Sequence, residues 1–256
     1  MISMKHFCAG LATSAALLVP CLTMANAIFY ADHLVLCDDF DDGTSGHAEL
    51  LGGASIQNGQ VYFSKGVNTG EKVKYAQAYL DHIGTDGITW VHDFKKGESP
   101  DAPNAPAWML NVNTTGGQAG ARLQNDQVSL RAASPGGFHG GGSIDAAYHR
   151  IAYTIRPTGD GKMEADVYLD GTPAGTSNPF DPVSVTSDGY IGASYSSWEY
   201  RFSDAYIDNV MIFNTGMTHA QVAGIPTTCS GIVPEPSTML LGCGLAAALA
   251  GLRRRR

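Results

Sequence analysis

Hydrophobic and polar residues alternate with a period of two in short runs between residues 28 and 230, and glycine, asparagine or aspartate separates the runs. This period places successive side chains on opposite faces of an extended chain, so the runs predict half-buried β-strands. The predicted strands are residues 33–37, 60–63, 87–94, 107–112, 121–124, 127–132, 148–156, 163–169, 189–193 and 205–213. So many short strands at this spacing favour a β-sandwich or a barrel.

Turn-forming dipeptides lie between the predicted strands. They combine asparagine or aspartate with glycine, as tight hairpin turns prefer: Asn58-Gly59, Asp86-Gly87, Asp160-Gly161, Asp170-Gly171 and Asp188-Gly189. Thr218 and Gln221 have the spacing of a capping box and predict one short helix. The glycine-rich residues 136–142 are expected to form a flexible loop tip.

The N-terminal segment has the pattern of a secretory signal peptide over residues 1–27. A mildly basic start precedes an apolar run over residues 7–22 and a small-x-small site at residues 25–27. We expect signal peptidase to cleave after Ala27. A lipoprotein signal that uses Cys21 is the weaker alternative, because the residues before it match a lipobox poorly.

The C-terminal segment, residues 231–256, has three parts in a fixed order. The motif Pro234-Glu235-Pro236 precedes an apolar run over residues 239–252, and four arginines end the chain: Arg253, Arg254, Arg255 and Arg256. Residues 237–252 number 16, fewer than the ~20 that span a hydrocarbon core, and the arginines would stay on the cytoplasmic side. The arrangement resembles the PEP-CTERM sorting signal of Gram-negative bacteria.

This resemblance implies a processing route. A membrane protease-transpeptidase, the exosortase, would recognise the signal while the tail anchors the protein transiently in the inner membrane. Cleavage near Pro234–Pro236 would then leave the protein at the cell surface or in the medium. Proteins with this signal usually accompany exopolysaccharide production. An ordinary C-terminal membrane anchor is the alternative interpretation of the same residues.

Charge and cysteine content narrow the possibilities for the central domain, residues 28–230. Without Lys5, Glu235 and the terminal arginines, 11 of the 16 basic and 23 of the 24 acidic residues remain, a net charge of about −12. This charge repels nucleic acid, so nucleic-acid binding is not expected. Of five cysteines, only Cys37 and Cys229 lie in this domain. In an exported domain they are predicted to form a disulfide, with two buried free thiols as the alternative.

Several segments of the central domain resemble motifs of laminin-G-like, concanavalin-A-like jelly rolls. They occur in the family's order: Phe40–Gly43, Tyr148–Tyr153, Val167–Gly171, Ile191–Ala193 and Ile207–Phe213. The resemblance implies an all-β jelly-roll β-sandwich whose first and last strands are neighbours, which suits a Cys37–Cys229 bridge. The sequence departs from the family's pattern at Tyr148, where tryptophan is usual.

The same resemblance implies a structural calcium ion. Four carboxylates lie within five positions, at Asp38, Asp39, Asp41 and Asp42. In related jelly rolls the ion lies where the opening segment meets the final strand, so the matching ligands are Asp208 with Asp39 or Asp41, and a carbonyl near Gly59. Calcium prefers six to eight such oxygen ligands. The alternative is an acidic loop in solvent.

Catalytic patterns are incomplete, so no catalytic residue is predicted. Glu164-Ala165-Asp166 resembles the E-x-D-x-x-E strand of concanavalin-A-like β-glucanases, but Leu169 stands where the second glutamate should be. His139–Gly142 resembles an esterase oxyanion loop, but the chain has no G-x-S-x-G nucleophile motif.

Carbohydrate binding is the function that the remaining residues favour. Sugars pack on aromatic rings and bond to planar polar groups. Trp198, Tyr200 and Trp108 are the candidate platforms, although packing in the core or at its rim is the favoured interpretation for any one of them. Trp90, within an alternating strand, is expected in the core. We therefore expect a non-catalytic domain that binds exopolysaccharide or another surface component. A diverged glycan hydrolase or lyase and a purely structural surface protein are the alternatives.

Overall fold

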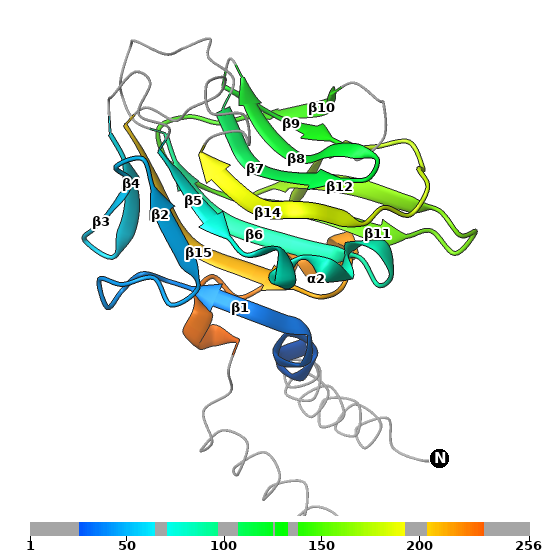
Figure 1. Ribbon diagram of the computed structural model, residues 1–256, viewed down its shortest axis with the longest axis horizontal. Coiled ribbons are helices and arrows are strands. Elements are labelled where there is room, and N and C mark those ends of the chain that lie inside the picture. The colour runs from blue at the N-terminus through cyan, green and yellow to red at the C-terminus, as the bar shows by residue number, and fades with distance from the viewer. Residues whose placement is uncertain are drawn as a thin grey trace, which may run out of the picture. The chain divides into compact units, whose positions relative to one another are not determined.

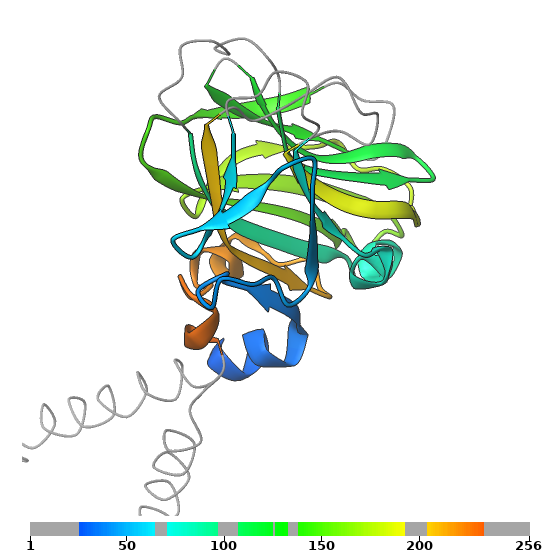
Figure 2. The same cartoon turned by 60° about the vertical axis from the view of Figure 1, so that its left-hand side comes forward.

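Two antiparallel sheets stack face to face within residues His33–Ile225 (Figures 1 and 2). The computed structural model describes residues 26–64, 71–96, 107–124, 126–132, 138–192 and 204–232. Residues 1–32 and 226–256 form a second unit, of which residues 26–32 are helical and η3 is Cys229–Gly231. The prediction of an all-β jelly-roll β-sandwich is confirmed.

One sheet has eight strands. Its order is β13 (Thr172–Thr176), β12 (Met163–Leu169), β11 (Tyr148–Pro157), β6 (Ile88–Lys95), β15 (Ala205–Phe213), β4 (Gln60–Phe63) and β3 (Ser55–Gln57), and β1 (Leu34–Asp38) also pairs with β15. The first and last strands are therefore neighbours, as the resemblance implied. Cys37 and Cys229 are joined in a disulfide, which confirms the predicted pairing.

The other sheet has seven strands. Its order is β10 (Phe138–Ser143), β9 (Gln127–Arg131), β8 (Gly117–Gln124), β7 (Ala107–Thr114), β14 (Val185–Gly192), β5 (Lys72–Tyr75) and β2 (Ala48–Leu51). The short helices of the domain are η1 (Gln77–Tyr79), η2 (Asp81–Gly84) and α2 (His219–Ala223). Helix α2 begins where the capping box predicted it: the Thr218 amide donates to Gln221 Oε1 at 2.8 Å.

Alternate residues of the strands fill the space between the sheets. Trp90 of β6 is 1% exposed and belongs to this core, as predicted. The two hairpin turns Asn58-Gly59 and Asp170-Gly171 have positive φ at both residues, as turns of type I′ require. These turns confirm the local sequence prediction.

Two glycine-rich predictions are wrong. Asp188-Gly189 lies inside β14 and forms no turn. The glycine makes room for Trp90 instead, because a Cβ on Gly189 would lie 2.8 Å from the indole ring. The expected loop tip at residues 136–142 contains strand β10. A Cβ on Gly140 would lie 2.3 Å from the Ala174 carbonyl oxygen, so glycine lets β10 approach β13 at the edge of the sandwich.

The predicted targeting segments fall largely outside the described residues. The apolar run at residues 7–22, Pro234-Glu235-Pro236 and Arg253–Arg256 all lie there. Within the described ranges, no helix is long and apolar enough to cross a membrane. Export and sorting therefore stay predictions.

Candidate ligand-binding face

The predicted aromatic platforms have different outcomes. Trp198 and Tyr200 lie outside the described residues. Trp108 is only 1% exposed in β7, a central strand of the seven-stranded sheet, where its Cα partners are Arg122 of β8 and Gly192 of β14. The structure thus contradicts the expectation that Trp108 offers an open platform, because neighbouring groups cover its ring.

A different aromatic group crosses the eight-stranded sheet. Tyr62, Tyr206, Lys95 and Tyr148 are successive cross-strand partners on β4, β15, β6 and β11, and we call them the tyrosine row. Their neighbours along the strands, such as Phe94, lie in the core between the sheets. Because side chains alternate along a strand, the tyrosine row lies on the outer face of this sheet.

The tyrosine row is partly open to solvent. Tyr148 is 44% exposed, a large value for an aromatic side chain, whereas Tyr62 and Tyr206 are half-buried. The rings of Tyr62 and Tyr206 have centroids 5.0 Å apart. Lys95 Nζ lies 5.5 Å from the centroid of the Tyr148 ring and 5.9 Å from that of Tyr206, so the ammonium group contacts two aromatic faces.

A polar row lies beside the tyrosine row, at a separation of two residues on each strand. It consists of Gln60, Asp208, Asp93 and Arg150. Arg150 binds Asp93 with two parallel bonds, Nε to Oδ1 at 2.7 Å and Nη2 to Oδ2 at 2.9 Å. This bidentate pair has fixed geometry and neutralises both partners.

Gln60 joins the two rows. The Tyr148 hydroxyl donates to Gln60 Oε1, and Gln60 Nε2 donates to Asp208 Oδ2 at 3.3 Å. Asn209, at the bulge of β15, donates its backbone amide to Asp208 Oδ1 at 2.7 Å and its side-chain amide to Asp93 at 3.0 Å. Tyr148 and the polar row therefore form one hydrogen-bonded network across four strands.

Asp208 is half-buried and lacks a cationic partner among the described residues. Burial raises the pKa of its carboxyl group to about 6, although hydrogen bonds from Asn209 and Gln60 oppose the shift. The charges of Asp93 and Asp41 raise this pKa further. A cation or a hydrogen-bond donor from a ligand would relieve this repulsion.

The predicted calcium ligands Asp41 and Asp208 come to the same end of the sheet. A Cβ built on Gly59 would lie 3.0 Å from Asp41 Oδ1, so the acidic opening segment meets the β3–β4 turn. Asp39 instead accepts a long bond, 3.5 Å, from the Asp41 amide. In the described part of the chain, no group of three or more His, Cys, Asp or Glu side chains is placed to hold a metal ion.

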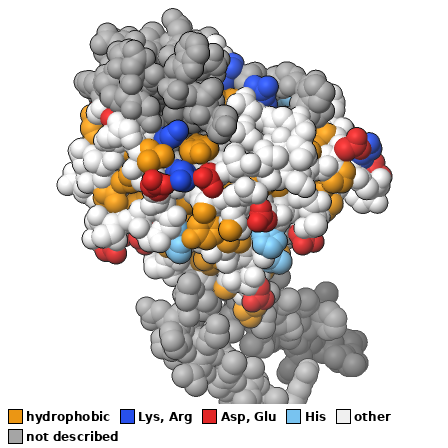
Figure 3. Space-filling view, viewed as in Figure 1, with side chains coloured by type: hydrophobic (Ala, Val, Ile, Leu, Met, Phe, Trp, Pro, Cys, Tyr) orange, Lys and Arg blue, Asp and Glu red, His pale blue; other side chains and the backbone are white. Residues whose placement is uncertain are grey.

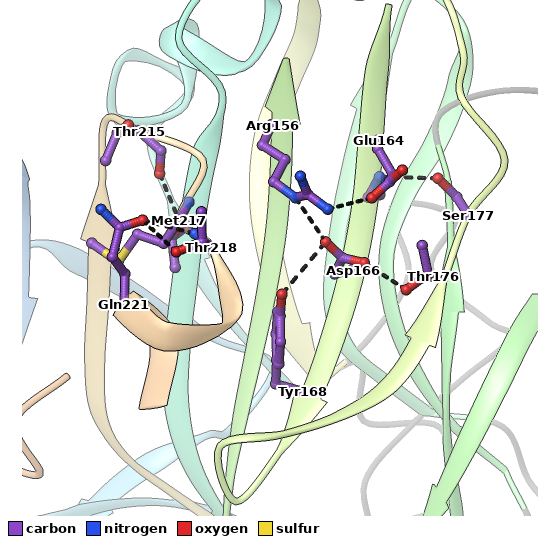
Figure 4. A network of polar contacts seen from close by, with 12 residues as sticks. Arg156, Glu164, Asp166, Tyr168, Thr176, Ser177, Thr215, Met217, Thr218 and Gln221 are labelled. Atoms are coloured by element: carbon purple, nitrogen blue, oxygen red, sulfur yellow. Dashed lines mark hydrogen bonds and ion pairs between the residues drawn. The ribbon is translucent and has the colours of Figure 1, made fainter. Parts of the chain in front are cut away.

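Glu164 and Asp166 on β12 both bind Arg156 of β11 (Figure 4). Arg156 Nε lies 3.0 Å from Asp166 Oδ2, and Thr176 Oγ1 donates to Asp166 Oδ1 at 2.6 Å. Burial alone would lower the pKa of Arg156, but the hydrogen bond and charge of Asp166, with Glu164, raise it on balance. The acceptor atoms of these carboxylates thus serve the protein's own side chains.

Sequence reasoning missed most of the two rows. The missed residues each occupy an outward-facing position of an alternating run, and this position is the only signal that the sequence gives for them. They are Tyr62, Tyr206, Lys95, Gln60 and Asp93. These residues become neighbours only through the order and register of four strands that are far apart in the chain.

The chain belongs to the concanavalin A-like lectin/glucanases superfamily, because the family model Laminin_G_3 of that superfamily matches residues 78–223. This agrees with the two-sheet fold described above. No curated protein matches the chain in sequence.

Several solved structures have a similar fold. Trypanosoma rangeli sialidase in complex with sialic acid has a TM-score of 0.54 at 19% identity, over 75% of this chain and 32% of the sialidase. The botulinum neurotoxin serotype D binding domain has a TM-score of 0.52 at 12% identity, over 75% and 51%. The binding domain of botulinum neurotoxin DC in complex with SialylT has a TM-score of 0.54 at 11% identity, over 76% of this chain and 51% of the toxin domain. This chain therefore spans about a third of the sialidase and half of the toxin domains, and the likeness is one of fold.

Proposed function

We propose that this protein is an exported, non-catalytic carbohydrate-binding protein whose tyrosine row holds the glycan. The exposed ring of Tyr148 beside the Gln60–Asp208 pair carries the proposal. Sugar C–H groups pack on aromatic faces, while carboxylates and amides bond to the hydroxyl groups around them. Both kinds of group lie next to each other on this face. The complexes of sialidase with sialic acid and of neurotoxin DC with SialylT support a glycan as the ligand.

A non-catalytic role agrees with the ion pairs that the two carboxylates on β12 form with Arg156. A retaining glycosidase needs one carboxyl group free to attack and another free to donate a proton. Arg156 engages both Glu164 and Asp166. Release of reducing sugar from the native exopolysaccharide by the purified protein would favour an enzyme instead.

Export and sorting are part of the proposal. In this scheme, signal peptidase removes residues 1–27 and exosortase cleaves near Pro234–Pro236. The Cys37–Cys229 disulfide supports folding in an oxidising compartment. Mass spectrometry of the protein from its native culture would test the scheme. We expect a mature chain that starts at Ile28 and lacks Arg253–Arg256, whereas a full-length intracellular chain would contradict it.

We also propose a bound calcium ion at Asp41 and Asp208, with a carbonyl near Gly59 and water as further ligands. The mutual repulsion of the two carboxylates and the contact of Asp41 with the β3–β4 turn support this site. Calcium should raise the melting temperature of the wild type but not of Asp208→Asn. Asp42→Asn is the control, because Asp42 accepts its bonds from Thr44 in the exposed loop. Equal shifts in both variants, or no shift in the wild type, would exclude the site.

A glycan array with the mature domain tests the binding proposal directly. We expect retention of at least one glycan class, including the native exopolysaccharide, and about tenfold weaker binding by Tyr148→Ala. Tyr79→Ala is the matched control, because Tyr79 lies on η1 and contacts His47 rather than the tyrosine row. Retention of no glycan would favour the structural surface protein, and equal losses in both variants would exclude the tyrosine row as the binding site.

A further inference from the structure

The lysines of the domain fall into two groups by their partners. Among the five lysines that the structure describes, three form ion pairs with carboxylates: Lys74 with Glu49, Lys96 with Asp126 and Lys162 with Asp181. Neighbouring basic and acidic side chains are visible near the middle and at the right-hand end of the face in Figure 3. In the same described set, Lys95 and Lys72 have no carboxylate partner and lie over tyrosine rings instead.

Lys95 is unusual because the domain offers it many carboxylates. The central domain has 23 acidic and only 11 basic residues, so each lysine has many carboxylates available as partners. A lysine without a carboxylate partner is therefore unexpected. The ammonium group of Lys95 lies between the Tyr148 and Tyr206 rings, where the partial negative charge of the aromatic faces holds it. The tyrosines thus keep a positive charge in the middle of the row.

The other cation of the two rows is already neutralised. Arg150 forms its bidentate pair with Asp93, with both side chains largely buried. Asp208, in the same polar row, bonds to Gln60 and Asn209. Within the two rows, Lys95 is therefore the cation that forms no ion pair with a carboxylate.

We propose that the glycan held on the tyrosine row is acidic, and that Lys95 binds its carboxylate or sulfate group. This inference rests on the proposed function of the same face. A sugar ring on Tyr148 would place its substituents towards the adjacent Lys95, because the two residues are direct cross-strand partners. A charge-assisted hydrogen bond there is stronger than a neutral one. The local positive charge also offsets the repulsion that a domain of net charge about −12 exerts on an anionic glycan.

Matched pairs of oligosaccharides test the inference. An oligogalacturonide is compared with its carboxyl-reduced counterpart, and a sulfated oligosaccharide with its desulfated counterpart, by calorimetric titration of the mature domain. We expect the wild type to bind the acidic member about fivefold more tightly than the neutral one. Lys95→Met should bring this ratio close to one, because methionine keeps an apolar stem between the rings but has no charge. Lys95→Arg should retain the preference.

Lys72→Met is the matched control, because Lys72 also lies over a tyrosine ring, Tyr190, but on the outer face of the other sheet. It should leave the ratio unchanged. Equal binding of acidic and neutral members by the wild type would overturn the inference and leave the proposed function in place. An unchanged ratio in Lys95→Met would do the same. Binding of no member of either pair would count against both proposals.

Discussion

Gly189 lies in the middle of β14 and faces the largest side chain of the core. A Cβ at this position would lie 2.8 Å from Leu80 Cδ1 and 2.8 and 2.9 Å from atoms of the Trp90 ring. Trp90 has little room to move, because it is 1% exposed and packs edge-to-face on Tyr75 with centroids 5.3 Å apart. Gly189→Ala therefore overpacks the core, and overpacking by one carbon costs about 1–3 kcal/mol. We expect the free energy of unfolding to fall by about 2 kcal/mol.

Urea unfolding followed by tryptophan fluorescence and circular dichroism measures this change. Gly46→Ala is the matched control, because no atom lies within 4 Å of a Cβ at Gly46. It should stay within about 0.5 kcal/mol of the wild type. In a Trp90→Phe background, Gly189→Ala should cost less, because the smaller ring vacates the space that the new methyl group needs. Equal stabilities of the two alanine variants, or the same cost in both backgrounds, would refute this account of Gly189.

Three further predictions concern pH and redox state. Reduction of the Cys37–Cys229 disulfide, which closes most of the chain into a loop, should lower the free energy of urea unfolding by about 4–5 kcal/mol; a loss below about 1 kcal/mol would contradict the entropic estimate. His92 is 1% exposed, and neither of its ring nitrogens has a partner among the described residues. Burial, together with the charge of Arg150, lowers the pKa of His92 from 6.5 to about 3. Stability should thus be lost as the pH falls from about 6.5 towards 3, and His92→Leu should weaken this acid sensitivity in pH-dependent unfolding. Burial lowers the pKa of His149, but its bonds to Asp170 and Asp145 outweigh burial and raise the pKa above 6.5. Its contribution should be complete below pH 6.5 and disappear as the pH rises through the folded-state pKa, and an unchanged slope in His149→Gln would exclude it.

Local patterns gave most of the strands, because burial on one face imposes a period of two on any half-buried strand. Each predicted strand overlaps one in the structure, such as residues 205–213 with β15. The strands that were not predicted are short or rich in glycine, such as β3 (Ser55–Gln57) and β10. A strand of three residues is too short to show a period of two in its hydrophobic pattern. Glycines have no side chain, so their positions do not indicate which face of a strand is buried.

The candidate site was much less accessible to sequence reasoning. The resemblance to jelly rolls pointed to Asp208 and Asp41, and the structure brings both to one end of the sheet. The aromatic platforms were chosen for being tryptophans near loops, and Trp108 is buried. Exposure depends on what packs over a ring, and the residue type does not determine it.

The sequence by itself determined the period-two strands and the place of Trp90 in the core, because both follow from local burial. It predicted the Cys37–Cys229 pairing with free thiols as the alternative, and the structure shows the disulfide. Only the tertiary structure decided that Tyr62, Tyr206, Lys95 and Tyr148 form one row, and that Lys95 lies between rings while other lysines pair with carboxylates. The physical reason is that cross-strand neighbours are set by sheet order and register. These depend on long-range packing of both sheets, and a single strand's alternation contains no information about its partner.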